Sequence, residues 1–321
     1  MGLERNIMKF INALRDGDRI SQVFLCKQKQ MLTGKSGKSY GALVLQDKTG
    51  TVDAKIWDFG PGIENFEAAD FIYVDAEVST FNNNLQVVIR RLRVAREGEY
   101  VQNDYLPMTT KDIDVMYKEL IGLIAKVSNS KLRELLESFF IKDAQFVKEF
   151  KTHSAAKSVH HGFIGGLLEH TLSVTKLCYF YCQLYPQLNK DLLLTAAMFH
   201  DIGKLKEISD FPVNDYTDEG QLLGHIVIGC EMVGERIKSI PDFPAKTATE
   251  LRHCILAHHG EFEYGSPKKP ALMEAAALNF ADNTDARMET FIEQVVGAQS
   301  KEWLGFNRFI DSNVRKTTPT E

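Results

Sequence analysis

Apolar and polar positions change their spacing once along the chain, near residue 105. In residues 1–100, short runs rich in β-branched and aromatic side chains alternate with turn residues, a pattern typical of β-strands. Asp-Lys-Thr-Gly at 47–50 and Phe-Asn-Asn-Asn at 81–84 are predicted turns. The predicted strands are VFLCKQKQML, YGALVLQD, TVDAKIWD, FIYVDAEV and LQVVIRRLRV. Strands this short, with no helical pattern between them, predict a small barrel or sandwich.

After Tyr105-Leu106-Pro107, apolar residues recur at every third or fourth position, which predicts helices. This pattern begins at Lys111 and continues to about Phe309, so the rest of the chain is expected to be almost wholly α. The fold class is therefore multidomain α and β. We expect a β-barrel domain at 1–100, a helical connector at 101–150, an all-α domain at 151–310 and a flexible polar tail at 311–321.

Composition limits the class of protein only broadly. With 44% hydrophobic and 25% charged residues, the 321-residue chain resembles an ordinary soluble protein. No apolar run approaches the ~20 residues needed to cross a bilayer. The N-terminus lacks the apolar core of a secretory signal. We therefore expect a cytoplasmic protein with no membrane partner. The net charge of −5 divides into +1 for residues 1–100 and −6 for the remainder, so any nucleic-acid contact must rely on local patches.

The histidines carry the strongest chemical signal. All nine lie between His153 and His259. Several interrupt otherwise apolar helical runs, together with two aspartates: His170, His200-Asp201, His225, His258-His259 and Asp282. One such histidine alone is usually a core residue, but several buried polar groups need a common partner. A divalent metal cluster satisfies them best, and imidazole with carboxylate ligands suits Mn, Fe, Zn or Ni.

The stretch AAMFHDIGK, residues 196–204, suggests how two metals would be held. Adjacent helical residues point ~100° apart, so His200 and Asp201 reach one centre only in the groove between their directions. This suits an Asp201 carboxylate whose two oxygens bridge two metals. Lys204 then projects near the cluster, unless it is simply a solvated residue after the helix.

The order His170, His200-Asp201, Asp282 resembles the H…HD…D signature of the HD-domain metal-dependent phosphohydrolases. His225 and His258 match the extra histidines of HD proteins with a two-metal centre. The resemblance implies that the metal ligands are His170, His200, Asp201 and Asp282 for one ion, and Asp201, His225 and His258 for the other. His259 could replace His258, contact phosphate, or cap the helix.

A two-metal centre suits phosphoester hydrolysis, because two ions activate water and neutralise charge on the phosphate. The expected catalytic residues are Asp201 and Lys204, whose cation would face phosphate oxygens or the leaving group. The expected substrate contacts are His161, His259 and Lys268. His161 precedes His170 by nine residues, so it reaches the site only if the helix breaks at Gly165-Gly166. Lys268 lies in a loop, 260–270, that we expect over the mouth of the site.

The segment YGALVLQDKTGTVDAKIWD resembles a strand pair of an OB fold. OB folds bind single-stranded nucleic acid by stacking bases on aromatic side chains beside basic ones. The resulting candidates for nucleic-acid contact are Phe24, Lys35, Lys38, Tyr40, Trp57, Phe81 and Arg90. Such a barrel would hold the strand and raise its local concentration at the HD site.

Over nearly its whole length the chain resembles the YhaM family of bacterial 3′→5′ exoribonucleases, which join an OB fold to an HD domain. The matching stretches are HHGFIGGLLEHT, AAMFHDIGK, AHHGEFEYGSPKKP and ADNTDA. The resemblance implies hydrolysis of single-stranded RNA from its 3′ end to nucleoside 5′-monophosphates. The expected cofactor is a pair of divalent ions, Mn²⁺ first, with Fe²⁺, Co²⁺ or Ni²⁺ as other choices.

Several alternatives stay open at this stage. Single-stranded DNA is a second potential substrate, and self-association into a homo-oligomer is a further expectation. An HD phosphohydrolase of free nucleotides or cyclic dinucleotides would carry the same ligands, with the OB fold serving assembly. A non-catalytic single-strand-binding factor would use the HD domain only as structure.

Overall fold

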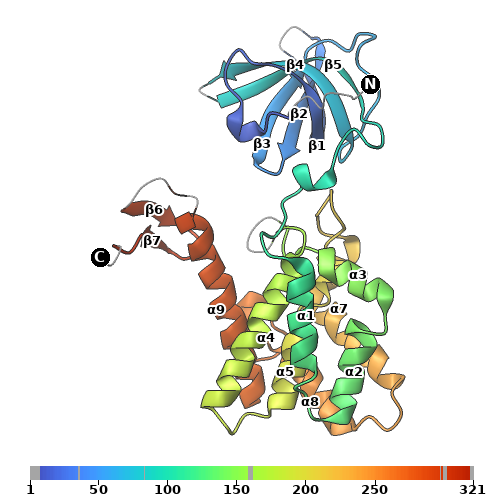
Figure 1. The fold of residues 1–321 in the computed structure, drawn as a ribbon, viewed down its shortest axis with the longest axis vertical. Coiled ribbons are helices and arrows are strands. Elements are labelled where there is room, and N and C mark those ends of the chain that lie inside the picture. Colours follow the sequence, from blue (N-terminus) through green and yellow to red (C-terminus); the bar gives the residue numbers. More distant parts are fainter. Residues whose placement is uncertain are drawn as a thin grey trace. The chain divides into compact units, whose positions relative to one another are not determined.

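A computed structural model describes residues 8–34, 37–82, 84–157, 162–296, 298 and 302–318. The chain divides into two compact units (Figure 1). One contains residues 1–108 and 210–213, and the other contains residues 109–209 and 214–321. Each unit has its own hydrophobic core.

The first unit is a closed five-stranded β-barrel. Its strands are β1 (Arg19–Thr33), β2 (Ser39–Asp47), β3 (Gly50–Ile56), β4 (Phe71–Phe81) and β5 (Asn84–Val94). The strands follow the order β1-β2-β3-β5-β4, and β4 pairs back onto β1. All pairs are antiparallel except β3 with β5. This is the small Greek-key barrel of the OB fold, and it confirms the predicted fold class for this part.

Both predicted turns connect strands as expected. Asp47 pairs with Gly50 across the β2–β3 turn, and Phe81 pairs with Asn84 across the β4–β5 turn. Short 3-10 turns, η1 (Ile11–Ala13) and η2 (Gln102–Asp104), precede and follow the strands. Alternation along each strand places one face of apolar side chains inside the barrel.

The second unit is mainly helical. Its helices are α1 (Ile113–Ile124), α2 (Ser130–Phe140), α3 (Ala144–Thr152), α4 (Gly166–Leu184), α5 (Lys190–Phe199), α6 (Lys204–Glu207), α7 (Asp218–Lys238), α8 (Ala245–Leu256) and α9 (Met273–Val296), with a 3-10 turn η3 (Phe262–Tyr264). Helices α4, α5 and α9 run side by side (Figure 1). This arrangement confirms that a helical part follows the barrel, as the predicted fold class has it. Within the described part of the chain, no helix has the length and apolar character needed to span a bilayer.

The segment 101–150, for which the sequence predicts a connector, supplies α1, α2 and α3. Their apolar side chains belong to the same hydrophobic core as those of α4 to α9. Five phenylalanines form much of this shared core: Phe139, Phe140, Phe146, Phe150 and Phe199. The helices of that segment therefore pack directly behind the helices that carry the histidines.

The C-terminal prediction is wrong in one respect. We expected helix to about Phe309 and a frayed tail, but β6 (Trp303–Asn307) and β7 (Ser312–Arg315) form an antiparallel hairpin. Asn307 Oδ1 accepts the backbone N–H of Phe309 at 2.8 Å, which stabilises the turn. Val314 is only 2% exposed, so its burial holds part of the polar tail in place.

Candidate metal centre and nucleic-acid surface

The first group of predicted ligands comes from α4, from the segment that follows α5, and from α9. His170 lies in α4, His200 follows the last residue of α5, and Asp282 lies in α9. The Nε2 atom of His170 is 3.3 Å from Asp201 Oδ2 and 3.2 Å from Asp282 Oδ1. His200 Nε2 is 3.4 Å from the same Asp201 oxygen. With metal–ligand bonds of ~2.0–2.2 Å, the ligand atoms of one ion lie about 3–3.5 Å apart.

The other oxygen of Asp201 faces a second group. His225 Nε2 is 3.5 Å from Asp201 Oδ1, and His258 Nε2 is 3.7 Å from it. These three atoms are fully buried, and none has a hydrogen-bond partner among the described residues. Buried polar atoms without partners are costly, and three that face one point fit a metal ion. The residues present therefore fit a divalent metal site in which Asp201 is shared.

His259 lies in the second group as well. Ligand atoms of His225, His258 and His259 all lie within 4.8 Å of one another. His258 is completely buried, whereas His259 is partly exposed. The structure thus places both histidines at the cluster, with His258 on the inner side.

Five imidazole rings in this cluster are held through the same nitrogen. Each bonds Nδ1 to an acceptor: a backbone carbonyl for His200, His258 and His259, and a carboxylate for His170 and His225. Carbonyl and carboxylate oxygens only accept, so each Nδ1 carries the hydrogen. In a neutral ring this tautomer leaves the lone pair on Nε2, as metal binding requires.

Burial and charge set the protonation of the ligands. Burial would raise the pKa of Asp201, but Lys204 and His200 beside it hold that pKa well below its usual range. Burial, together with His259 and His200, lowers the pKa of His258 well below its usual value. Burial alone would lower the pKa of His170, but three surrounding carboxylates raise it well above the ordinary value. Asp201 is thus ionised and His258 neutral, the forms that bind metal.

Two glycines allow α6 and α7 to approach the cluster. Gly224 has φ +73°, a conformation that other residues rarely adopt, and it breaks α7 immediately before His225. A Cβ atom on Gly203 would lie 2.0 Å from the carbonyl oxygen of His225. The glycine of the HDIGK stretch is therefore needed for the close contact between the α5–α6 segment and the broken α7.

Two carboxylates that the sequence analysis did not single out support the ligands. Glu207 Oε1 accepts both the backbone N–H of His225, at 2.9 Å, and its Nδ1–H, at 2.8 Å. Asp285 Oδ2 accepts from His170 Nδ1 at 2.7 Å. Asp285 follows Asp282 by three residues on one helix, so the pair shares a face. That spacing was the available signal for Asp285, whereas Glu207 had no comparable signal.

The remaining predicted residues of this unit lie at different depths. Lys204 Nζ is 2.7 Å from Asp201 Oδ2, and its side chain is 17% exposed. Asp201 outweighs the effect of burial and raises the pKa of Lys204, so the lysine stays charged. Lys268 is exposed on the loop after η3. His161 lies outside the described residues, although Gly165, with φ +85°, does precede a helix that begins only at Gly166.

Three of the predicted base-stacking residues meet on the barrel. Tyr40, Trp57 and Phe81 line one cavity of about 450 Å³, together with Lys55. The rings of Tyr40 and Trp57 lie 5.0 Å apart, and Lys55 Nζ lies over the Tyr40 ring. Trp57 is 55% exposed and Phe81 62% exposed. Exposed aromatic rings beside a lysine are what OB folds use to bind single strands.

The other predicted contacts are distributed differently. Phe24 is fully buried in the barrel core, so its prediction as a base contact is wrong: its ring faces inward and no base can reach it. Arg90 is paired with Glu77 and lines another recess with Arg19 and Asp75. Lys38 is exposed next to β2. Lys35 lies outside the described residues.

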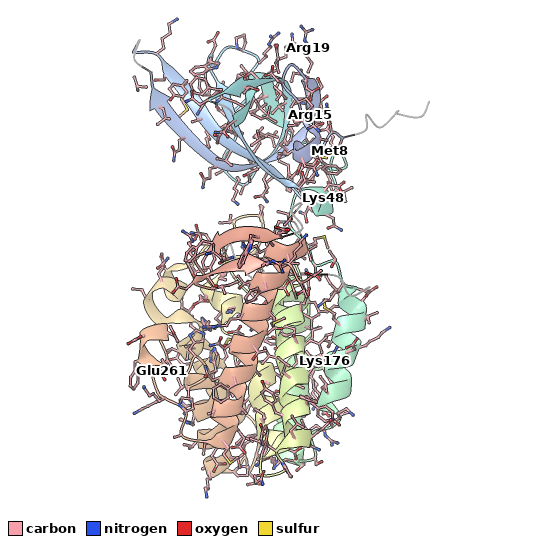
Figure 2. The ribbon with its side chains drawn as sticks, turned by 90° about the vertical axis from the view of Figure 1, so that its left-hand side faces the viewer. Met8, Arg15, Arg19, Lys48, Lys176 and Glu261 are labelled. Carbon is pink, nitrogen blue, oxygen red and sulfur yellow. The ribbon has the colours of Figure 1, made fainter. Side chains whose placement is uncertain are left out.

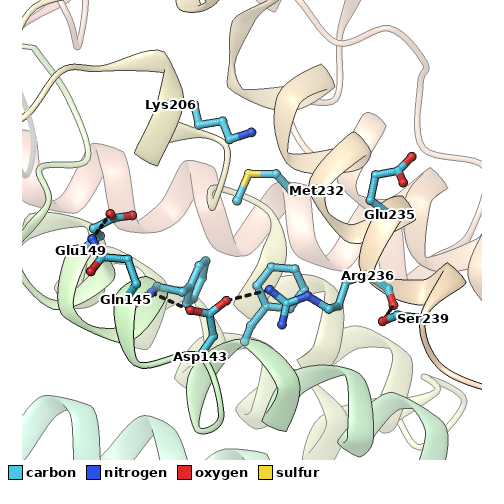
Figure 3. Close-up of a pocket in the computed structure, with 10 residues that line it drawn as sticks. Asp143, Gln145, Glu149, Lys206, Met232, Glu235, Arg236 and Ser239 are labelled. Atoms are coloured by element: carbon cyan, nitrogen blue, oxygen red, sulfur yellow. Dashed lines mark hydrogen bonds and ion pairs between the residues drawn. The ribbon is translucent and has the colours of Figure 1, made fainter.

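A further cavity of about 450 Å³ lies between α2, α3 and α7 (Figure 3). Asp143 and Arg236 pair across it at 2.8 Å, and Arg236 also stacks on Phe139. Lys206 and Met232 line its opposite wall. Its arginine and aspartate neutralise each other, and among the described residues the buried polar atoms without a partner all lie in the histidine cluster and not here.

Comparison with known proteins gives the class of this chain and then its family. The HD domain family matches residues 167–287, which contain all six predicted metal ligands. The chain thus joins an OB-type barrel to an HD domain. It is 34% identical over 276 residues to the 3′-5′ exoribonuclease YhaM of Geobacillus sp. (strain WCH70), covering 85% of this chain and 83% of that protein. It is 36% identical over 276 residues to YhaM of Bacillus velezensis, covering 85% and 86%. The chain belongs to the YhaM family.

Solved structures resemble the barrel only slightly. The second OB-fold domain of replication protein A from Methanococcus maripaludis is 16% identical, covers 27% of this chain and 94% of its own, and gives a TM-score of 0.22. An OB domain from Methanosarcina mazei is 17% identical, covers 32% and 94%, and gives a TM-score of 0.25. Scores this low carry no argument, so the OB assignment depends on the strand order of the barrel itself.

Proposed function

We propose that this protein is a metal-dependent 3′→5′ exoribonuclease that hydrolyses single-stranded RNA, and also single-stranded DNA, to nucleoside 5′-monophosphates. In each cycle water adds to the last phosphorus, and the bond from that phosphorus to the preceding 3′ oxygen breaks. The 3′ oxygen takes a proton. The products are one nucleoside 5′-monophosphate and a strand one nucleotide shorter.

The observation that carries the proposal is the shared carboxylate of Asp201. One of its oxygens faces His170 and His200, and the other faces His225 and His258. A carboxylate placed between two such groups is suited to hold two metal ions, with Asp282 completing the first group. Membership of the YhaM family supports the substrate and the direction of degradation.

The chain's own residues would position the phosphate and balance its charge. When bound, divalent ions would supply Lewis acidity that lowers the pKa of water and neutralises charge on the phosphate. Lys204 holds a positive charge beside Asp201 Oδ2, where it can stabilise negative charge on the phosphate or the departing oxygen. Burial and His225 lower the pKa of His259, and its Nδ1–H is already donated to Tyr264, so its Nε2 can accept a hydrogen bond from the substrate or serve as a further ligand.

The ligand set combines imidazoles and carboxylates. The first group offers two imidazoles and two carboxylates, and the second offers two or three imidazoles and one carboxylate oxygen. Imidazole suits Fe²⁺ and Ni²⁺ and carboxylate suits Mn²⁺, whereas Mg²⁺ prefers oxygen ligands alone. Because the ligand set admits Mn²⁺ and the resemblance to the YhaM family implies it, we propose Mn²⁺ as the activating ion.

The test is degradation of a single-stranded RNA labelled at its 5′ end, with Mn²⁺ and with Mg²⁺. We expect a ladder that shortens from the 3′ end, release of 5′-mononucleotides, and much lower activity with Mg²⁺. In Asp201→Asn we expect activity to fall to background, because the shared ligand loses its charge.

Asp114→Asn is a suitable control, since that aspartate lies on α1 with a side chain that is 74% exposed. It should degrade RNA like the unchanged protein. Intact RNA in the presence of demonstrably bound Mn²⁺ would refute the exonuclease proposal, and hydrolysis of free nucleotides under the same conditions would replace it.

A further inference from the structure

The turn that follows the cluster histidines is tied directly to the metal centre. It begins at Gly260, immediately after His259, and contains η3. His259 Nδ1 donates to the backbone carbonyl of Tyr264 at 2.8 Å. The His259 ring lies 5.1 Å from the ring of His225. The backbone of the turn is therefore one residue removed from the second group of ligands.

The same turn is anchored on two helices. Gly260 has φ +79° and packs so closely on Asn279 of α9 that a Cβ atom would lie 2.6 Å from the amide nitrogen. Asn279 Nδ2 donates to the carbonyl of His258 at 2.7 Å. Ser266 is 3% exposed, and its hydroxyl donates to the carbonyl of Leu256 in α8 at 3.0 Å. Buried hydrogen bonds thus fix both ends of the turn.

Despite this anchoring, the turn presents two aromatic rings to solvent. Phe262 is 62% exposed and Tyr264 is 63% exposed. The charges around them are mixed. Glu261, at the outer surface of this unit in Figure 2, pairs with Lys269 at 2.5 Å, and Lys269 lies over the Phe262 ring. Neither ring belongs to the hydrophobic core of this unit, and both lie on the turn that follows the cluster histidines.

We propose that Phe262 and Tyr264 form a stacking platform for the bases at the 3′ end of the single strand. This inference rests on the proposed exoribonuclease function and adds a contact beside the metal centre. Every base has a π-face, so stacking accepts any sequence, as a processive degradation of RNA requires. Glu261 and Lys269 balance each other's charge, so we assign the contact to the rings and not to a charged patch. A strand whose last phosphate lies at the cluster has its nearest bases beside this turn.

The experiment compares Phe262→Ala, Tyr264→Ala and the double variant with the unchanged protein. Phe180→Ala is the matched control, because Phe180 lies on α4 and is 52% exposed. The substrates are one fluorescent single-stranded RNA and versions of it with an abasic nucleotide at each of the last four positions. We measure KM and kcat with Mn²⁺, and the Kd for RNA with EDTA in place of Mn²⁺.

We expect each single variant to raise KM and Kd about tenfold, equivalent to ~1.4 kcal/mol of lost stacking, and to change kcat less. Phe180→Ala should leave both unchanged. An abasic nucleotide at the stacked position should weaken binding to the unchanged protein by a similar factor. It should have no further effect on the double variant, because the partner ring is already missing.

The inference is overturned if the double variant binds RNA like the unchanged protein. It is also overturned if the abasic substitution weakens both proteins equally. Because Kd is measured without hydrolysis, failure of the proposed function is a separate result: RNA that stays intact with Mn²⁺ while Kd still depends on the rings refutes the exonuclease and keeps the platform.

Discussion

Each inward-facing imidazole of the cluster is oriented by an acceptor on its outer nitrogen. For three rings this acceptor is a backbone carbonyl, which no substitution of a side chain can remove. For His225 and His170 it is a carboxylate, Glu207 or Asp285. These two carboxylates touch different ligands, so each should influence one metal ion without being a ligand itself.

Glu207→Ala should lower the affinity of the protein for one of its two Mn²⁺ ions by about 10- to 100-fold. The alanine removes the acceptor of both the His225 Nδ1–H and the His225 backbone N–H. Glu207→Gln keeps an accepting oxygen and should lose less. Titration with Mn²⁺, counting free ion by electron paramagnetic resonance, measures both affinities.

Asp285→Ala removes the acceptor of the His170 Nδ1–H, so it should lower the affinity for the other ion. The exposed Glu235 on α7, with a side chain that is 72% exposed, gives the control Glu235→Gln. If Glu207→Ala lowers the affinity for both ions equally, or lowers only the stability of the metal-free protein, then the role of Glu207 is not confined to positioning His225.

Metal binding should displace a proton from His170. The raised pKa of His170 keeps its Nε2 protonated in the metal-free protein, and an ion must displace that proton. Asp201 and Asp282 have lowered pKa values and are already ionised, while His258 has a lowered pKa and is already neutral. None of these three contributes a proton.

The affinity for Mn²⁺ should therefore fall as pH falls, by about tenfold per unit below the pKa of His170. Calorimetry in two buffers of different ionisation enthalpy measures the number of protons released. A binding enthalpy that is the same in both buffers would contradict the assignment of that proton.

The sequence predicted the residues of the cluster better than their supports. His170, His200, Asp201 and Asp282 are separated along the chain, but each interrupts an apolar run, and that pattern is visible in the sequence. Glu207 is one acidic residue among many, and only the break of α7 at Gly224 gives it a role. Phe24 was instead predicted as a contact and is not one, since an aromatic residue in a strand can face either side.

At the scale of elements, the close contact between the α5–α6 segment and α7 leaves no room for a side chain at Gly203. Gly203→Ala should lower the free energy of unfolding by about 1–3 kcal/mol or more. The added Cβ would meet two backbone atoms, the His225 carbonyl oxygen at 2.0 Å and the Gly229 nitrogen at 2.6 Å. Backbone atoms cannot rotate away as a side chain can.

Gly122→Ala is the matched control for that substitution. Gly122 lies inside α1, and a Cβ there would meet nothing within 4 Å. It should raise the free energy of unfolding by about 0.5–1 kcal/mol, because alanine favours helix over glycine. Denaturant unfolding of the metal-free protein measures both. If both substitutions change the free energy of unfolding by the same amount, the close contact at Gly203 does not constrain stability.

The elements themselves were largely predictable, because patterns of apolar residues sustained over long stretches determine them. Short runs of β-branched and aromatic residues in the first hundred residues predicted the barrel, and apolar spacing of three to four afterwards predicted the helices. The hairpin of β6 and β7 was missed, since only one of its side chains, Val314, is deeply buried. A two-stranded element with so little buried surface leaves almost no pattern in the sequence.

At the scale of the whole molecule, the proposed function assigns one contact with the strand to each of the two units. In the barrel these are Tyr40, Trp57 and Phe81, and in the helical unit the metal centre. We expect a long RNA to engage both contacts and a dinucleotide to engage only one. Binding at one unit then raises the effective concentration of the strand at the other.

Trp57→Ala should therefore raise KM about tenfold for a twenty-nucleotide RNA, a loss of ~1.4 kcal/mol from one stacking contact, and should leave KM for a dinucleotide unchanged. The chain has two tryptophans, so Trp303→Ala, at a position that is 61% exposed in β6, controls for loss of an exposed indole. KM for each substrate is measured from steady-state rates. An equal rise in KM for both would mean that Trp57 acts on the metal centre through the fold, whereas no rise for either would exclude the barrel cavity as a contact for the strand.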